Sequence, residues 1–228
     1  MTRKALKQKL TSQSQMSESF ILAAMLAFCG GFQDAYTYIV RDKVFANAQT
    51  GNVVLMSIDL FNGRILTALR YLIPLSAFAA GIFIAENVQF YYKHSRKLHW
   101  RQTILIPEML IMAAAGFFPA SLDLAANCLI SFSCAMQVQS FRTVSGNAYA
   151  STMCIGNLRS AVCAVSAYAR DKEPSHKDTA LYYFGVILVF ALGAAVCGLI
   201  APHLGIHTIW LSLPILLTSF LMMELDRE

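Results

Sequence analysis

Apolar residues along this chain form long, nearly continuous segments that are separated by short polar stretches. Six segments approach the roughly 20 residues that an α-helix needs to cross the hydrocarbon core of a bilayer. They are Phe20–Val40, Tyr71–Tyr91, Thr103–Ser121, Leu124–Phe141, Leu181–Ala201 and Ile206–Met223. The pattern predicts an all-α, polytopic membrane protein in which residues 1–18 form a polar N-terminal tail.

Two further segments, Thr50–Phe61 and Thr152–Ala169, are weaker candidates for membrane spans. Each has a Gly-Asn pair near its start, and they contain Asp59 and Arg159, respectively. We interpret them as short or re-entrant helices, which gives six full spans plus two short helices. The alternative is a fold of eight spans, in which both segments cross the membrane and each half has four helices.

The weak segments belong to an internal repeat. Similar residues recur in the same order at offsets of 104 to 112 positions. The matched pairs are Gln33 with Gln137, Gly51-Asn52-Val53 with Gly156-Asn157-Leu158, Phe78-Ala79-Ala80-Gly81 with Phe190-Ala191-Leu192-Gly193, and Ile106-Pro107 with Leu213-Pro214. The pattern indicates a duplication, with a first membrane repeat at residues 19–122 and a second at 123–228.

Basic residues favour six spans, because cytoplasmic loops of membrane proteins carry an excess of Lys and Arg. With six spans, one side holds the N-terminal tail, the 93–101 loop, the 142–177 region and the C-terminus, which contain most basic residues. The other side keeps Arg41, Lys43, Arg64 and Arg70. The sequence therefore predicts two inverted three-span halves with cytoplasmic N- and C-termini. With eight spans, the basic 93–101 loop would lie outside.

Composition supports a membrane protein and excludes other classes. Hydrophobic residues make up 57% of the 228 and charged residues 14%, against about 45–50% and about 25% in soluble domains. A soluble enzyme, a disordered chain and a nucleic-acid-binding domain are therefore excluded, and the net charge of +5 comes from loops beside apolar segments. The six cysteines and five histidines form no recognisable ligand or catalytic motif. We expect no enzymatic activity, no metal site, no cofactor and no nucleic-acid partner.

Asp34 lies within the first apolar segment. A carboxylate in hydrocarbon costs roughly 2.5–3.5 kcal/mol on insertion scales, so it needs a partner or a watery cavity. Asp34 is therefore a candidate site for a cation or proton. The alternative is an interfacial aspartate near Arg41.

Four amide side chains are placed alike in the two repeats. Asn52 and Asn157 lie at the starts of the two short segments, and Gln33 and Gln137 precede them by 19 and 20 residues. The N-terminus of a half-helix presents free N–H groups, and paired interrupted helices mark the binding sites of transporters. We expect the four amides to surround one internal site. The alternative is that each Gly-Asn pair only packs two helices closely.

Two charged residues lack a counterpart in the other repeat. Val138 corresponds to Asp34, and Val54 corresponds to Arg159. We expect Asp34 and Arg159 to lie within the amide cluster as an ion pair that a charged solute or proton could open. The alternative for Arg159 is that its side chain reaches the inner membrane surface.

The motifs Gly31-Phe32-Gln33-Asp34-Ala35 and Thr50-Gly51-Asn52 resemble those of the YoaK-like bacterial multi-pass membrane proteins, a family of unknown function. The resemblance extends from about residue 20 to residue 223, although Ile155 stands where the family tends to have Thr. It implies several transmembrane helices in the bacterial cytoplasmic (inner) membrane, and it implies no reaction and no ligand.

These features predict a transporter or permease of small solutes, with a substrate site between the two repeats. The lipid bilayer is the expected partner, a small molecule or ion is the candidate substrate, and the sequence indicates no oligomeric state. The alternative is a membrane protein that does not transport, such as a scaffold, a sensor or a subunit of a complex.

Overall fold

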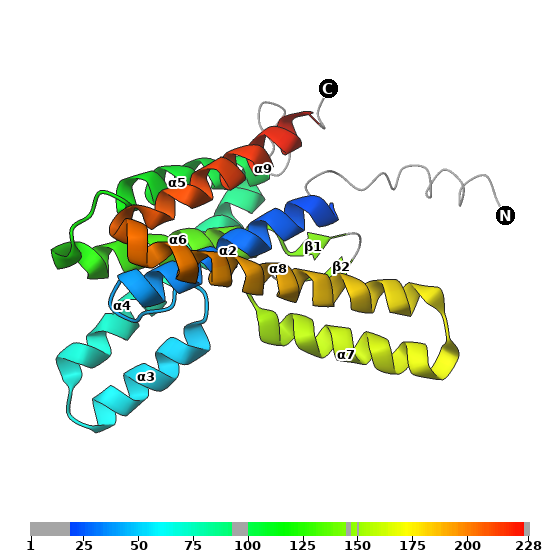
Figure 1. Cartoon of the computed structure of the whole chain (residues 1–228), viewed down its shortest axis with the longest axis horizontal. Coiled ribbons are helices and arrows are strands. Elements are labelled where there is room, and N and C mark those ends of the chain that lie inside the picture. Colours follow the sequence, from blue (N-terminus) through cyan, green and yellow to red (C-terminus); the bar gives the residue numbers. More distant parts are fainter. Residues whose placement is uncertain (1–18, 93–99, 145–146, 150, 226–228) are drawn as a thin grey trace.

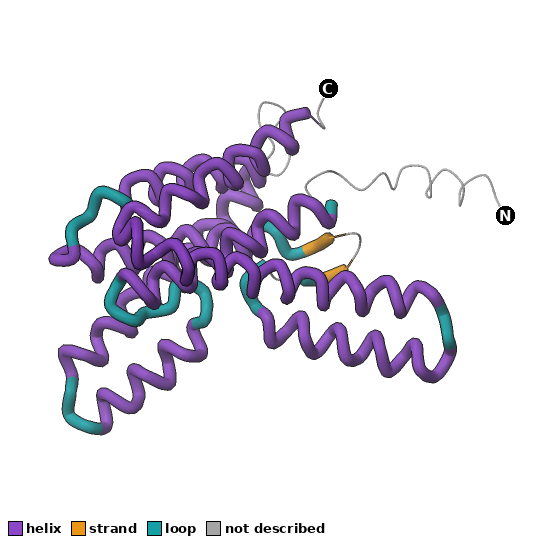
Figure 2. Tube along the Cα trace, in the orientation of Figure 1, coloured by secondary structure: helices purple, strands orange, loops and turns teal. Residues whose placement is uncertain are grey.

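The computed structural model describes residues 19–92, 100–144, 147–149 and 151–225, and its fold is almost entirely helical (Figures 1 and 2). The helices are α2 (Phe20–Val40), α3 (Gln49–Phe61), α4 (Ile65–Tyr92), α5 (Trp100–Ala115), η2 (Ala120–Leu122), α6 (Asp123–Ser140), α7 (Cys154–Asp171), α8 (Pro174–Leu204), η3 (Gly205–Ser212) and α9 (Leu213–Leu225). Strands β1 (Thr143–Val144) and β2 (Asn147–Ala148) form one short antiparallel pair. The predicted all-α class is confirmed. The predicted tail at 1–18 and most of the 93–101 loop lie outside the described residues.

The helix boundaries follow local chemistry. Ser19 caps α2, because its Oγ accepts a hydrogen bond from Leu22 N at 3.2 Å. Pro174 begins α8, where its missing N–H removes no helical bond. At the other end of α8, Gly205 has a φ of 54°, and this backbone turn separates α8 from η3 and α9.

Four long helices form the centre of the bundle in two crossed pairs, because α2 packs along α8 and α4 packs along α6. Helix α5 packs beside α6, while η3 and α9 pack beside α2. The start of α2, the end of α9 and the α7–α8 turn lie at one end of the bundle (Figure 1, right). The α5–α6 connection, the α8–η3 turn and the α3–α4 turn lie toward the other end.

Glycines allow the crossed helices to touch backbone to backbone. A Cβ on Gly31 would overlap the carbonyl oxygen of Phe190, and a Cβ on Gly193 would overlap that of Phe28. The α4–α6 crossing repeats this geometry, because a Cβ on Gly81 would overlap the carbonyl oxygen of Phe132. Small residues at such contacts let helices approach closely in a membrane.

Helices α3 and α7, which contain the two weak segments, form hairpins with α4 and α8, respectively, and the two hairpins diverge from the bundle (Figure 1). We call α3 and α7 the short helices, although α7 has 18 residues, as many as α6. Both short helices begin near the middle of the bundle. Helix α3 runs toward the end that holds the α5–α6 connection, whereas α7 runs toward the opposite end. The short segments are therefore helical as predicted, and they point in opposite directions.

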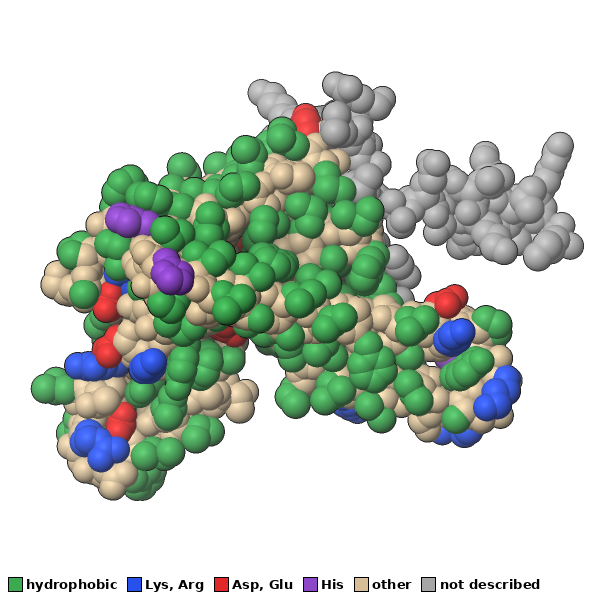
Figure 3. Space-filling model, viewed as in Figure 1, with side chains coloured by type: hydrophobic (Ala, Val, Ile, Leu, Met, Phe, Trp, Pro, Cys, Tyr) green, Lys and Arg blue, Asp and Glu red, His purple; other side chains and the backbone are tan. Residues whose placement is uncertain are grey.

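By length and composition, four helical stretches are apolar enough to cross a membrane: Phe20–Val40, Ile65–Tyr92, Ala120–Ser140 and Pro174–Glu224. The last stretch has 51 residues and contains α8, η3 and most of α9, while α5 has only 16 residues. Hydrophobic side chains also cover much of the surface, as expected for contact with lipid (Figure 3). These features support a membrane location.

Arg41, which the sequence places on the side with few basic residues, is buried at the end of α2. Its Nη1 lies 2.7 Å from Asp123 Oδ1, and its Nε donates to Tyr36 Oη at 2.9 Å. The carbonyl oxygens of Ala115 and Phe118 accept two further bonds from the guanidinium group. Arg41 therefore joins the end of α2 to the α5–α6 connection, and its partner is Asp123 rather than Asp34.

We predict that Gly193→Ala lowers the stability of the protein. The added methyl group would overlap the Phe28 carbonyl, so α2 and α8 must separate, and overpacking of this kind costs about 1–3 kcal/mol or more. The matched control is Gly198→Ala on the same helix, where the nearest atom would lie at 3.9 Å. Thermal unfolding in nanodiscs should show a lower midpoint for Gly193→Ala only. Equal midpoints for the two variants would contradict the packing role of Gly193.

Candidate binding site between the short helices

A pocket of about 760 Å³ lies where the short helices α3 and α7 begin. The residues that line it come from α2, from α4 and α8, and from the starts of α3 and α7. They are Asp34, Ala35, Tyr38, Ile39, Phe45, Asn47, Ala48, Gln49, Thr50, Phe78, Thr152, Met153, Cys154, Ile155, Gly156, Phe190 and Ala194. The starts of both weak segments therefore line one cavity.

The lining residues come from matched positions of the two halves. Residues 47–50 precede or begin α3, and residues 152–155 do the same for α7, at a constant offset of 105 positions. Phe78 on α4 and Phe190 on α8 form another matched pair, at an offset of 112. The pocket therefore lies between segments that the sequence comparison pairs.

Asp34 lies on α2 with only 6% of its surface exposed, and it is the one ionisable carboxylate among the described residues that line the pocket. Its Oδ1 accepts hydrogen bonds from Asn47 N at 2.6 Å and Ala48 N at 3.4 Å. These N–H groups lie at the start of α3, where a negative charge is favoured by the helix dipole. Asp34 thus supports the start of α3 and also faces the pocket.

Asn52 is fully buried, but it bonds to its own loop and does not line the pocket. Its Oδ1 accepts from Phe45 N at 3.0 Å, and its Nδ2 donates to Phe45 O at 2.7 Å and Gln49 Oε1 at 2.8 Å. The amide therefore closes the loop between α2 and α3. Asn157 is also buried, on α7, and is likewise outside the pocket lining.

The two glutamines join α2 to α6 in the interior. Gln33 Nε2 donates to Glu108 Oε1 at 3.2 Å, and Gln33 Oε1 accepts from Cys134 Sγ at 3.1 Å. Gln137 Nε2 donates to Leu26 O at 3.3 Å and Ser151 Oγ at 3.2 Å. Both side chains are fully buried and neither lines the pocket. The expected ring of four amides around one cavity is therefore not formed by the described residues.

Arg159 is exposed on α7, and in the described part of the chain it makes no ion pair with Asp34. The predicted ion pair between Asp34 and Arg159 is therefore wrong, because Asp34 is buried at the pocket whereas Arg159 is exposed on α7. Of the six candidate residues, Asp34 alone lines the pocket.

Comparisons with known proteins agree with the helical membrane fold. A family profile described as "Protein of unknown function (DUF1275)" matches residues 22–222. The chain belongs to this DUF1275 family. It is also 25% identical over 212 residues to the UPF0700 transmembrane protein YoaK of Bacillus subtilis (strain 168), across 89% of this chain and 92% of YoaK. No solved structure matches. The resemblance to YoaK-like proteins is therefore confirmed.

Two polar residues of this DUF1275 protein line the pocket but were not among the sequence candidates. Asn47 is 4% exposed and Thr152 is 6% exposed, and neither Asn47 Oδ1 nor Thr152 Oγ1 has a hydrogen-bond partner among the described residues. An unpartnered buried polar atom is costly in a folded protein. Their positions differ by the repeat offset of 105, which is the signal that could have identified them.

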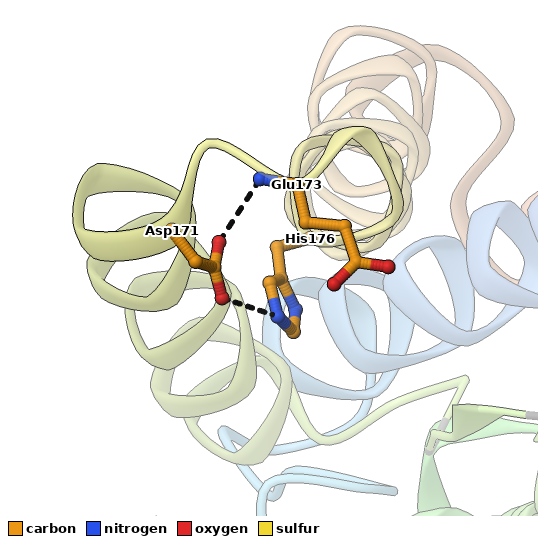
Figure 4. A group of neighbouring side chains, drawn as sticks. All are labelled: Asp171, Glu173 and His176. Carbon is orange, nitrogen blue, oxygen red and sulfur yellow. Dashed lines mark hydrogen bonds and ion pairs between the residues drawn. The ribbon is translucent and has the colours of Figure 1, made fainter.

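A second polar group lies outside the pocket, at the turn between α7 and α8 (Figure 4). The ligand atoms of Asp171, Glu173 and His176 are close enough together to hold a metal ion. Hydrogen bonding within the turn accounts for the arrangement, because the Asp171 carboxylate accepts from Glu173 N at 3.0 Å and pairs with His176 Nε2 at 3.1 Å. The bond from Glu173 N is the main cause of the lowered pKa of Asp171.

We predict that Asn52→Ala destabilises the protein by about 1–3 kcal/mol, because it leaves the N–H and C=O groups of the half-buried loop residue Phe45 without these partners. The control is Asn62→Ala at the exposed end of the same helix, where the lost bond is to Ile58 O. Thermal unfolding should separate the variants by several degrees. If Asn52→Ala matched the control, the loop would not depend on this amide.

Proposed function

We propose that this DUF1275 protein is a transporter or permease of small solutes, whose substrate site is the pocket between the starts of α3 and α7. The observation that carries the proposal is a cavity of about 760 Å³ that is lined by the buried polar residues Asp34, Asn47 and Thr152 and by the starts of α3 and α7. A protein that served only as a scaffold would not need a cavity of this size. Substrate sites of secondary transporters lie where paired broken helices meet near the bilayer midplane.

The proposal includes an inverted duplication of two three-span halves. The packing of α2 on α8 has its counterpart in the packing of α6 on α4. The glycine contacts support the same correspondence, because Gly193 and Phe28 match Gly81 and Phe132 at the repeat offsets. The opposite directions of α3 and α7 are those expected for inverted halves (Figure 1).

We further propose six membrane spans, with α3 and α7 as re-entrant helices that enter from opposite sides. The spans would be α2, α4, α5, α6, α8 and the η3–α9 segment. The start of α2, the end of α9 and the basic α7–α8 turn then share the cytoplasmic side of the inner membrane. The α3–α4 turn lies on the external side.

The topology makes a specific prediction for cysteine labelling. In a background without the six native cysteines, Asn62→Cys in the α3–α4 turn should react with a membrane-impermeant maleimide in intact cells. Lys172→Cys in the α7–α8 turn should react only after the membrane is permeabilised. Eight spans would place both positions inside and Lys97→Cys outside, so protection of Asn62→Cys together with labelling of Lys97→Cys would overturn the six-span topology.

Transport itself is tested with purified protein in proteoliposomes on a solid-supported membrane. A panel of organic cations, organic anions and neutral solutes should include compounds that produce saturable currents or, for neutral transport, saturable uptake. Asp34→Asn should reduce this flux by about tenfold or more, because it removes the charge in the pocket but keeps an acceptor for Asn47 N. The surface variant Asp171→Asn should behave like the wild type. Saturable binding without flux would identify a sensor, and neither binding nor flux would favour a scaffold or complex subunit.

A further inference from the structure

The polar wall of the pocket consists of oxygen acceptors. Asp34 uses Oδ1 for the start of α3, so Oδ2 is the oxygen available to a ligand. Asn47 Oδ1 and Thr152 Oγ1 have no hydrogen-bond partner among the described residues, but both atoms are shielded from solvent, so they reach a ligand only when their side chains turn toward the pocket. A primary ammonium group has three N–H donors and no acceptor, and three oxygens of this kind can satisfy it.

Asn47 and Thr152 both lie against the turn of α2 that precedes Asp34. Asn47 N bonds to Asp34, and Asn47 Nδ2 donates to Gly30 O at 3.3 Å. Thr152 lies against the other side of the same glycine, because a Cβ on Gly30 would overlap its methyl carbon. Asn47 and Thr152 therefore both contact α2 at Gly30, one turn before Asp34.

The charge of the pocket favours a cation. None of the described lining residues is Lys, Arg or His, and Asp34 carries a full negative charge when ionised. The start of α7 opposes this, because its N-cap residue Met153 supplies no side-chain bond and its free N–H groups carry about half a positive charge. The full negative charge of Asp34 outweighs the partial positive charge at the start of α7, so a cationic ligand is favoured. A ligand with a carboxylate, bound at the start of α7, is the main alternative.

The rest of the pocket is apolar and aromatic. Tyr38 stacks on Phe45 with ring centroids 4.7 Å apart. Phe78 on α4 and Phe190 on α8 also line the pocket. Aromatic faces attract cations as well as apolar groups. At the start of α7 the lining residue Ile155 is 80% exposed, so a ligand that enters between the short helices passes over apolar side chains.

We infer that the pocket binds an amphiphilic organic monocation, a primary ammonium group attached to an aromatic or alkyl body. This inference rests on the proposed function of the pocket. The ammonium group is held by Asp34, Asn47 and Thr152, and the apolar body packs against the aromatic side chains. An inorganic monovalent cation could use the same oxygens, but it would leave the apolar volume of the pocket unfilled.

The test uses the full chain in nanodiscs of zwitterionic lipid, with binding followed by the shift in thermal unfolding. Three probes share a phenylpropyl body: 3-phenylpropylammonium, 3-phenylpropanol and 3-phenylpropionate. Methylammonium lacks the apolar body, and sodium chloride provides an inorganic cation against choline chloride. We expect 3-phenylpropylammonium to stabilise the wild type at a concentration about tenfold lower than any other probe.

Two variants test the oxygens, and one serves as a control. Asp34→Asn should weaken 3-phenylpropylammonium binding by about tenfold or more. Thr152→Val removes a hydroxyl that has no described partner, so it should fold as stably as the wild type yet bind this probe several-fold more weakly. Thr152→Val therefore keeps the inference falsifiable even if Asp34→Asn does not fold. Asp171→Asn, in the exposed turn, should bind like the wild type.

Each other outcome overturns a defined part of the inference. Stronger binding of 3-phenylpropionate would identify an anion site, equal binding of 3-phenylpropanol would show that charge is not recognised, and stabilisation by sodium alone would identify an inorganic cation site. If no probe binds but other solutes produce flux in proteoliposomes, the substrate class is wrong and the transporter proposal stands. If there is neither binding nor flux for any solute, the proposed function fails as well.

Discussion

The close crossing of α2 with α8, and of α4 with α6, is the contact on which the other features depend. In a bilayer there is little hydrophobic force between helices, so van der Waals contact and hydrogen bonds must hold them together. Gly31 and Gly193 remove the side chains that would keep α2 and α8 apart. Because the backbones touch there, the turn of α2 that carries Asp34 lies beside α8, and the starts of both short helices meet the same cavity.

The short helices impose a second constraint, since each begins at the pocket with N–H groups that lack helical partners. Asp34 accepts bonds from Asn47 N and Ala48 N, Thr37 Oγ1 accepts from Ala46 N at 3.1 Å, and Asn52 bonds to both backbone groups of Phe45. The loop before α3 is therefore supported by buried polar side chains. Of the six polar residues that suggested a ligand site in the sequence, Asp34 and Asn52 serve this structural purpose.

The sequence predicted the elements better than the site. The apolar run at Phe20–Val40 matches α2, and the recurrent Gly-Asn pairs correctly identified two similar short helices. Spacing along a helix does not reveal what a side chain touches, so it could not distinguish Asp34, which faces the pocket, from Gln33, which bonds to Glu108. The repeat was located from similar residues at matched positions. Asn47 and Thr152 stand at matched positions but differ in residue type, so the sequence comparison did not identify them as candidates.

That difference at matched positions explains how one architecture gives the pocket two unlike walls. The first half contributes Asp34, Asn47, Gln49 and Thr50, whereas the corresponding residues of the second half are Val138, Thr152, Cys154 and Ile155. Under the proposed duplication, the glycine crossings that hold the backbone were kept in both halves, while the residues that face the cavity diverged. Val138 does not line the pocket, so Asp34 has no counterpart there. A second carboxylate in the cavity would place two like charges in an apolar environment at a large electrostatic cost. A single carboxylate avoids that repulsion and gives a bound solute one polar end and one apolar end to recognise.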